Sequence, residues 1–164
     1  MTVPAHVTAL LRHCADLRDR THGHAPAARG RPGKEVLFLQ TVPLLDRFAR
    51  QALEELNGPL LLDTGQVTAS GARRTGERGL EARWELSWPE QRLAGIGAVR
   101  LHAFYGAGFD HPHLQGGTVG RWPLNVFTAE QAAAELHTLR AIAVADLHNL
   151  AAQRDHRIIP AVRR

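Results

Sequence analysis

The sequence predicts an α+β fold, in which an antiparallel β-meander of three to four strands packs against N-terminal helices and a long C-terminal helix. Two patterns carry this prediction. Apolar residues recur every three to four positions near both ends of the chain, which is typical of amphipathic helices. Between them, segments in which apolar and polar residues alternate are joined by short connections that contain glycine, and this favours antiparallel neighbours.

The bulk properties point to a small cytoplasmic protein. A chain of 164 residues is enough for one hydrophobic core. No apolar stretch approaches the roughly 20 residues that cross a bilayer, so we expect no membrane partner. The single cysteine, Cys14, rules out an internal disulfide and suits a reducing compartment. The formal charge is +4, but acidic residues are mixed among the arginines, so we expect no specific nucleic-acid partner.

Residues 1–34 are predicted to form an amphipathic helix followed by a mobile loop, and residues 35–164 a single α+β domain. The helix has Pro4 in its first turn and one apolar face. Because Cys14 lies within this face, we expect its thiol to be buried as a small apolar group. The loop, residues 21–34, is rich in glycine and proline and long for a compact domain. The expected face consists of Val7, Leu10, Leu11, Cys14 and Leu17.

A second helix is predicted over residues 41–58, with Asn57 and Gly58 as its stop signal. The preceding apolar segment either belongs to this helix, with Pro43 as a kink, or forms a separate element. The expected inner face consists of Leu45, Phe48, Ala52 and Leu56.

Strands are predicted over residues 59–70, 80–88 and 98–106. The middle one has the clearest pattern, since apolar and polar residues alternate over nine positions, which places one face in the core. Its polar face carries Glu81, Arg83 and Glu85, and the third strand continues this charged strip. Cross-strand ion pairs account for the strip, and a partner-binding sheet face is the alternative. The residues that continue the strip are Arg100 and His102.

A capping box, formed by Thr128 and Gln131, predicts the start of a helix that runs from about residue 129 to 152. Its apolar positions recur with helical spacing and are expected to face the sheet. The chain is then predicted to end in a short extended segment over residues 157–162.

The segment 109–117, "FDHPHLQGG", contains the most concentrated reactive side chains. One hypothesis is a structural loop whose imidazoles bond to the backbone, since buried backbone groups need partners. A second is a metal site at His111 and His113, with Asp110, His102 or His137 as third ligand. The sequence has no cysteine pair and no H-E-x-x-H motif. We therefore assign no residue as a metal ligand beyond this hypothesis and expect no cofactor.

The run His111 to Gln115 resembles the His-Pro-His-x-Gln strand of hexose-phosphate uridylyltransferases and the wider histidine-triad superfamily. The resemblance implies that His113 attacks a nucleotide α-phosphate and that Gln115 binds a phosphate oxygen. Gly106 and Gly108 would then let the backbone approach the phosphates. A glycine pair after Gln115 is expected to interrupt any strand at this point. Under this alternative the chain is a nucleotidyl transferase or hydrolase, and its partner is a nucleotide.

The layout of residues 44–150 resembles the ubiquitin-conjugating-enzyme fold and the related RWD domains. In that fold a helix and an antiparallel meander precede a His-Pro-Asn flap, a Gly-x-x-Cys stretch, a Trp-x-Pro stretch and a long helix. Here the run His111–His113 stands at the flap, and Gly117–Gly120 stands at the Gly-x-x-Cys. Trp122 begins the tryptophan stretch, and the helix after Thr128 follows.

The catalytic cysteine of that fold is absent, since Gly120 stands in its place, and the flap asparagine is His113. The resemblance therefore implies a non-catalytic adaptor domain that binds a protein partner and forms no thioester. Whether the chain is an enzyme stays open between this hypothesis and the histidine-triad one. The candidate binding residues under the adaptor hypothesis are Asp110, His111, His113, Trp122, Arg100 and His102.

Overall fold

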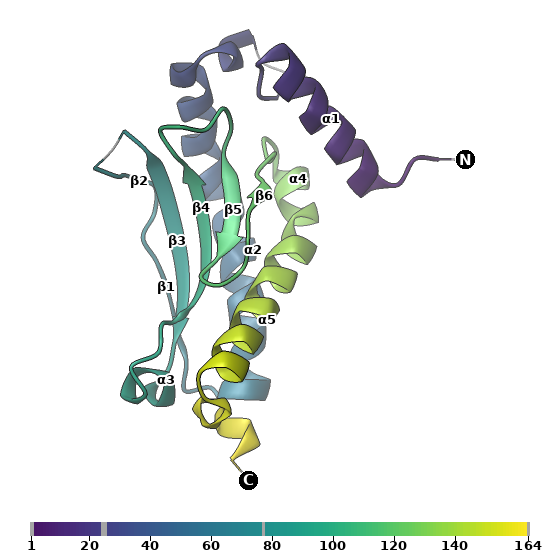
Figure 1. The fold of residues 1–164 in the computed structure, drawn as a ribbon. Helices are drawn as coiled ribbons and strands as arrows, with labels where there is room; N and C mark the ends of the chain where they lie inside the picture. Colours follow the sequence, from purple (N-terminus) through teal and green to yellow (C-terminus); the bar gives the residue numbers. More distant parts are fainter. Residues whose placement is uncertain (1, 24–25, 77, 164) are drawn as a thin grey trace.

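The computed structural model describes residues 2–23, 26–76 and 78–163, although the side chains of 26 and 27 lie outside the description. It shows an α+β fold, in which two long helices pack on one antiparallel sheet (Figure 1). The sheet has the strand order β1-β3-β4-β5-β6, and β2 pairs with β3. Within the described residues, no helix is both long and apolar enough to cross a bilayer. In chain order the elements are α1 (Ala5–Asp19), η1 (Pro26–Arg29), α2 (Arg31–Leu61), β1 (Gln66–Ala69), β2 (Arg73–Arg74), β3 (Leu80–Ser87), α3 (Pro89–Leu93), β4 (Val99–Tyr105), β5 (His113–Gly116), β6 (Trp122–Pro123), α4 (Ala129–Ala134), α5 (Leu136–Gln153), η2 (His156–Ile158) and η3 (Pro160–Val162).

Helix α2 is longer than predicted at both ends. It contains Pro43, so the preceding segment belongs to the same helix, and the predicted domain boundary after residue 34 falls inside it. Part of the predicted loop is therefore helical, while residues 24–25 lie outside the described part. The helix ends at Leu61, four residues after Asn57, where the predicted stop signal begins. Buried Asn57 accepts a hydrogen bond from Gly65 N at 2.8 Å and thereby holds the turn that follows the helix.

Of the three predicted strands, two are confirmed and one is much shorter than predicted. Residues 59–61 belong to α2, so the predicted first strand shrinks to β1. The other two are confirmed as β3 and β4, which pair in antiparallel register with Trp84 opposite Leu101. The sheet also contains two strands that were not predicted. Strand β5 lies in the segment 109–117, which one hypothesis gave as a loop, and β6 follows it.

Strand β5 includes Gly116, although the glycine pair after Gln115 predicts a break in any strand. Gly116 pairs with Leu101 of β4 and lies under α5. A Cβ atom there would lie 3.0 Å from Cγ2 of Ile142 and 3.1 Å from Cβ of Val119. The glycine therefore permits the close approach of α5 to the sheet, which is the other reason for glycine in a strand.

The C-terminal helix is confirmed in position but is divided in two. The hydroxyl of Thr128 accepts from Gln131 N at 3.1 Å, and the Gln131 side chain accepts from Phe127 N at 2.7 Å. The division falls at Glu135, between α4 and α5. The predicted extended tail is instead two short 3-10 turns, the first of which is held by Trp88, whose indole N–H donates to Ile158 O.

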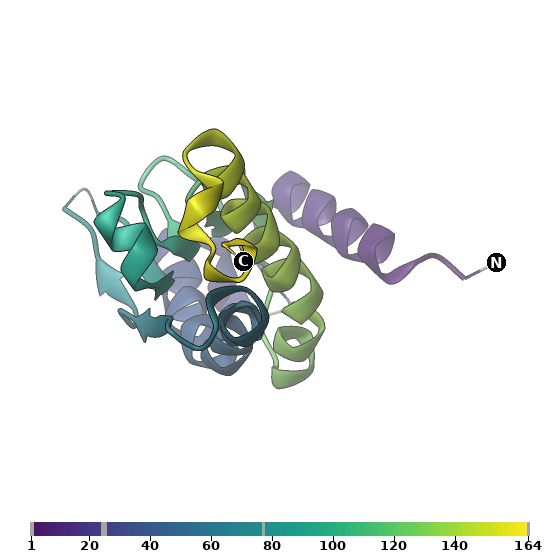
Figure 2. The ribbon, with the colours of Figure 1, turned by 90° about the horizontal axis from the view of Figure 1, so that it is seen from below.

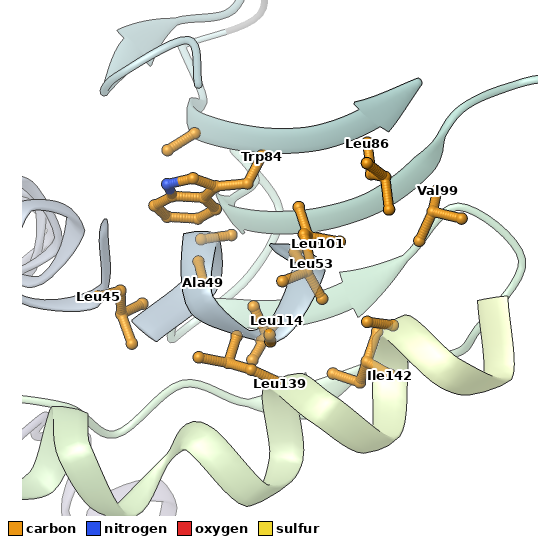
Figure 3. Close-up of a cluster of buried hydrophobic side chains, with 14 of the residues drawn as sticks. Leu45, Ala49, Leu53, Trp84, Leu86, Val99, Leu101, Leu114, Leu139 and Ile142 are labelled. Atoms are coloured by element: carbon orange, nitrogen blue, oxygen red, sulfur yellow. The ribbon is translucent and has the colours of Figure 1, made fainter. Parts of the chain in front are cut away.

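The hydrophobic core lies between the sheet and the pair α2 and α5 (Figure 3). Trp84 and Trp88 are its largest side chains. Trp84 is 1 % exposed, and its indole N–H donates to Asp46 Oδ1 at 2.8 Å. The alternation predicted for β3 is confirmed on this face. Figure 3 labels the main contributors, which are Leu45, Ala49 and Leu53 from α2, Trp84, Leu86, Val99, Leu101 and Leu114 from the sheet, and Leu139 and Ile142 from α5.

Candidate functional site

Helix α1 is packed with a polar residue inward and its apolar residues outward. It extends away from the sheet and the two long helices (Figures 1 and 2). Its one buried residue is His13, which is 6 % exposed. Leu10, Leu11 and Leu17 are 56 %, 60 % and 45 % exposed, and Cys14 is also exposed. The prediction of a buried thiol within an inward apolar face is therefore wrong.

His13 meets two histidines of the sequence-predicted segment. Its ring centroid lies 4.3 Å from that of His111, at an edge-on angle of 70°. The His111 ring lies 4.5 Å from that of His113, which opens strand β5. His22, from the connection after α1, packs on Phe127 with a centroid separation of 4.8 Å. We call these four residues (His13, His22, His111 and His113) the histidine cluster.

Further rings connect the histidine cluster to the outer face of the sheet. The ring of His113 lies 4.9 Å from Phe109 and 5.5 Å from Phe104. Phe104 in turn stacks on His102 at 5.2 Å. The guanidinium of Arg121 lies 4.8 Å from the centroid of Phe109, within the range of a cation–π contact. A continuous row of rings thus runs from α1 onto β4.

The expectation that the His111 imidazole bonds to loop backbone is not met at its Nδ1 atom. Within the described residues, the buried Nδ1 atom of each member of the histidine cluster has no hydrogen-bond partner. The loop backbone is held from α2 instead. Lys34 Nζ donates to Asp110 O at 2.6 Å, and Arg31 Nη1 donates to Gly106 O at 2.7 Å.

Burial keeps these imidazoles neutral at neutral pH. Loss of solvation, reinforced by the charge that its histidine neighbours would carry, lowers the pKa of His111 to about 4. Burial likewise lowers the pKa of His22 to about 4. For His13 burial lowers the pKa against the opposing pull of Asp16, and for His113 burial and the nearby Arg121 act together to lower the pKa.

His102 and His137, which were predicted as possible third metal ligands, do not lie with the histidine cluster in a metal-binding arrangement. His102 Nε2 lies 2.8 Å from Glu81 Oε2, and its Nδ1 lies 3.2 Å from Gln115 Nε2. His137 is exposed on α5. Across residues 2–23, 26–76 and 78–163, no group of three or more His, Cys, Asp or Glu side chains is arranged to hold a metal ion.

The polar face of the sheet is a network of ion pairs. Glu81 is 5 % exposed and accepts from Arg73 at 2.8 Å and from Arg83 at 3.0 Å. Across the next pair of strands, Arg100 donates to Glu85 at 2.7 Å. The predicted pairing across strands is therefore confirmed. The arginines of this strip are neutralised by Glu81 and Glu85.

The candidate binding residues fall into three places. Asp110, His111 and His113 lie at the α1 junction, while Arg100 and His102 lie within the ion-pair network of the sheet. Trp122 is 47 % exposed in the two-residue strand β6. Sequence reasoning missed the residues that complete the junction, because their contacts span distant segments. They are His13, His22, Phe104, Phe109 and Arg121.

A cleft of about 520 Å³ lies between α1 and the segment that leads into α5. Its wall includes His13, Asn125, Phe127 and Glu135. Burial raises the pKa of the Glu135 carboxyl above its ordinary value. The cleft therefore lies beside the histidine cluster, of which His13 is a wall residue.

The two residues carried over from the histidine-triad resemblance are both engaged. The His113 ring packs against Phe104 and Phe109, and the Gln115 amide is paired with His102. No family model matches this chain, and comparison with curated proteins and with solved structures finds no similar protein. Both family resemblances therefore stay predictions.

Proposed function

We propose that this chain is a non-catalytic protein-interaction module that binds its partner through helix α1. The observation that supports this function is the outward apolar face of α1. Three leucines of a single 15-residue helix are each about half exposed, while His13 occupies the inward position. Contiguous exposed apolar surface of this kind is characteristic of interaction sites.

The spacing of the face suits a helical or groove-shaped partner. Within the helix, Val7, Leu10, Cys14 and Leu17 follow one another at intervals of three, four and three residues. This is the interval pattern of a helix seam that packs on another helix. An isolated helix of about 15 residues is marginally stable in water, so burial of this seam by a partner would also stabilise α1 itself.

The charges beside the seam favour an acidic partner. Arg20, the C-cap residue of α1, forms no ion pair within the described part of the chain, whereas Arg18 is paired with Asp19 at 2.7 Å. Arg12 lines the cleft on the other side of the helix. Asp16 is turned toward the connection after the helix, where it accepts from Thr21 Oγ1 at 2.9 Å. The C-terminal end of the seam therefore carries an unpaired cation, Arg20. We infer a partner protein with an apolar groove or helix face that is bordered by Asp and Glu.

A site-specific photo-crosslink tests the proposal. A benzophenone amino acid at position 11, beside the seam, is irradiated in cells that express the chain, and the crosslinked protein is identified. The matched control carries the same group at position 93, because Leu93 is 89 % exposed on α3, away from α1. We expect one protein to be crosslinked from position 11 and absent from position 93.

The purified partner then allows a quantitative test. Leu10→Ala together with Leu17→Ala should weaken binding at least about tenfold, since each truncation removes roughly 1 kcal/mol or more of apolar burial. Leu93→Ala should leave the Kd unchanged, and added salt should weaken binding to the wild type. Equal crosslinks from both positions, or unchanged affinity in the double variant, would refute the proposal. A crosslink to a second copy of this chain would replace the acidic partner with self-association.

A further inference from the structure

We propose that the histidine cluster is a proton-operated latch, which keeps α1 docked while its imidazoles are neutral and releases α1 when they take up protons. The latch goes beyond partner binding, because it concerns the position of α1 in the free chain. Its success or failure can therefore be measured without any partner.

The geometry concentrates the contact of α1 in one place. His13 is the only buried residue between Ala5 and Asp19, and it packs edge-on against His111. His111 packs in turn on His113. The one buried contact of α1 is thus imidazole on imidazole, and each imidazole becomes a cation when it gains a proton.

The charged groups around the cluster leave little to neutralise such cations. From α1, Asp16 is the nearest carboxylate, and its two oxygens already accept from Thr21 Oγ1 and Gly23 N, at 2.9 and 3.3 Å. From the loop before β5, Asp110 exerts only a minor pull on His111. Lys34 of α2 acts on His22 and Arg121 acts on His113, and both are cationic. Glu135 shares the cleft wall with His13, but burial raises the pKa of its carboxyl. Asn125 is neutral, and its side-chain hydrogen bond only partly offsets the burial that lowers the pKa of His13.

The direction of the pH effect follows from the lowered pKa values. A histidine in the released state has its ordinary pKa near 6.5, whereas the pKa of docked His111 is about 4. Between these values the released state binds more protons, so a falling pH favours release. Because release exposes several histidines together, more than one proton can be taken up per release, which makes the transition steeper than the titration of a single group.

The test measures the distance from α1 to the body of the chain. Cys14, the only cysteine, is exposed on α1, and Leu93→Cys supplies a second exposed position on α3. Nitroxide labels at both positions give a distance distribution by pulsed electron paramagnetic resonance, from about pH 8 to about pH 4.5 in the presence of EDTA. The fluorescence of buried Trp84 and Trp88 reports the core in parallel samples.

Non-titrating variants separate the latch from a general effect of acid. His13→Phe, His111→Phe and His113→Phe are combined to keep aromatic packing without a proton site. His137→Phe with His148→Phe is the matched control, because both side chains are exposed on α5. If the triple variant does not fold, His111→Phe alone serves, with an expected shift of the release midpoint to lower pH.

We expect the wild type and the control to have one narrow distance at about pH 8 and a broad distribution below a midpoint between about 5 and 6.5. The core fluorescence should stay unchanged through this transition, and the triple variant should stay narrow throughout. A narrow wild-type distance at the lowest pH would overturn the proposal. So would a broad one at pH 8, an unaltered transition in the triple variant, or simultaneous unfolding of the core.

Discussion

The body of the chain and the α1 junction bury opposite kinds of side chain. Between the sheet and the helices α2 and α5, large apolar residues such as Trp84 and Leu101 are almost completely buried. At the junction, His13 and His22 are buried, while Leu10 and Leu11 face outward. Apolar burial stabilises the first region at nearly any pH, whereas burial of polar groups without partners opposes folding in the second.

This contrast means that stability is unevenly distributed along the chain. The body has a continuous core and strands in regular register, and we expect it to open only with global unfolding. The junction rests on edge-on and tilted imidazole rings whose Nδ1 atoms have no partner among the described residues, so its docking free energy is small and sensitive to protonation. A small docking free energy is what allows α1 to serve as an interaction element.

The largest expected effect is in the core. Trp84→Ala should lower the free energy of unfolding by about 3–5 kcal/mol, because it leaves a large cavity and removes the hydrogen bond to Asp46. Chemical denaturation monitored by circular dichroism measures the change. Trp122→Ala, at a 47 % exposed site, is the control and should change the value by less than about 0.5 kcal/mol. Equal effects of the two variants would contradict the assignment of the core.

The next effect concerns a buried polar group that, unlike the histidines, is fully partnered. Asp146 of α5 is 0 % exposed and accepts from Arg100 N at 2.8 Å and from Thr118 N and Oγ1 at 2.6 Å. Asp146→Ala should destabilise the body by roughly 2–4 kcal/mol, since each buried donor left unpaired costs about 1–3 kcal/mol. Denaturant midpoints compare it with Asp155→Ala, whose half-buried carboxylate caps the C-terminal turn η2 and accepts from Arg157 N, and which should cost less than half as much. A loss under about 1 kcal/mol would show that water replaces the carboxylate.

The pH dependence sharpens the comparison further. Because burial lowers the pKa values of His13, His22, His111 and His113, the unfolded chain binds more protons than the folded chain between about pH 6.5 and 4. The free energy of unfolding should therefore fall as the pH falls through this window. His111→Phe should flatten the fall, and His137→Phe should leave it unaltered. Hydrogen exchange at falling pH should show that the amides of α1 lose protection before those of the sheet. Equal loss of protection in α1 and the sheet would contradict the difference in stability between the junction and the body.

The smallest expected effect on stability is on the outward face of α1. Leu10→Ala should change the free energy of unfolding by less than about 0.5 kcal/mol, because the side chain is 56 % exposed. Leu53→Ala, in the core, changes the same residue type and should lose about 2–5 kcal/mol. Thermal denaturation of both variants measures the ratio. A large loss at position 10 would mean that its side chain packs within this chain.

Several elements could be predicted because their causes are local. The alternation from Leu80 to Ser87 requires an extended strand with one buried face, and the strand is present as β3. The capping residue Thr128 places a helix start within one residue of where α4 begins. The charged strip on the sheet was also predicted correctly, since period-two spacing determines which face each side chain occupies.

Other features could not be predicted because their causes are distant in the chain. Gly116 indicates a strand break by itself, and its compatibility with β5 depends on the approach of Ile142 from α5. The apolar periodicity of α1 correctly predicts a helix with one apolar side. Periodicity does not state whether that side meets the core, since both outcomes have the same local pattern.

The sequence by itself determined the fold class, the main helices and the central strands of the sheet, because hydrophobic period and capping act over a few neighbouring residues. Only the tertiary structure decided that His13 faces inward and meets His111 and His113, nearly a hundred residues later in the chain. It also decided that the leucines of α1 stay outside, because the long helices and the sheet complete the core without them. The proposed interaction site and latch both follow from that choice of faces.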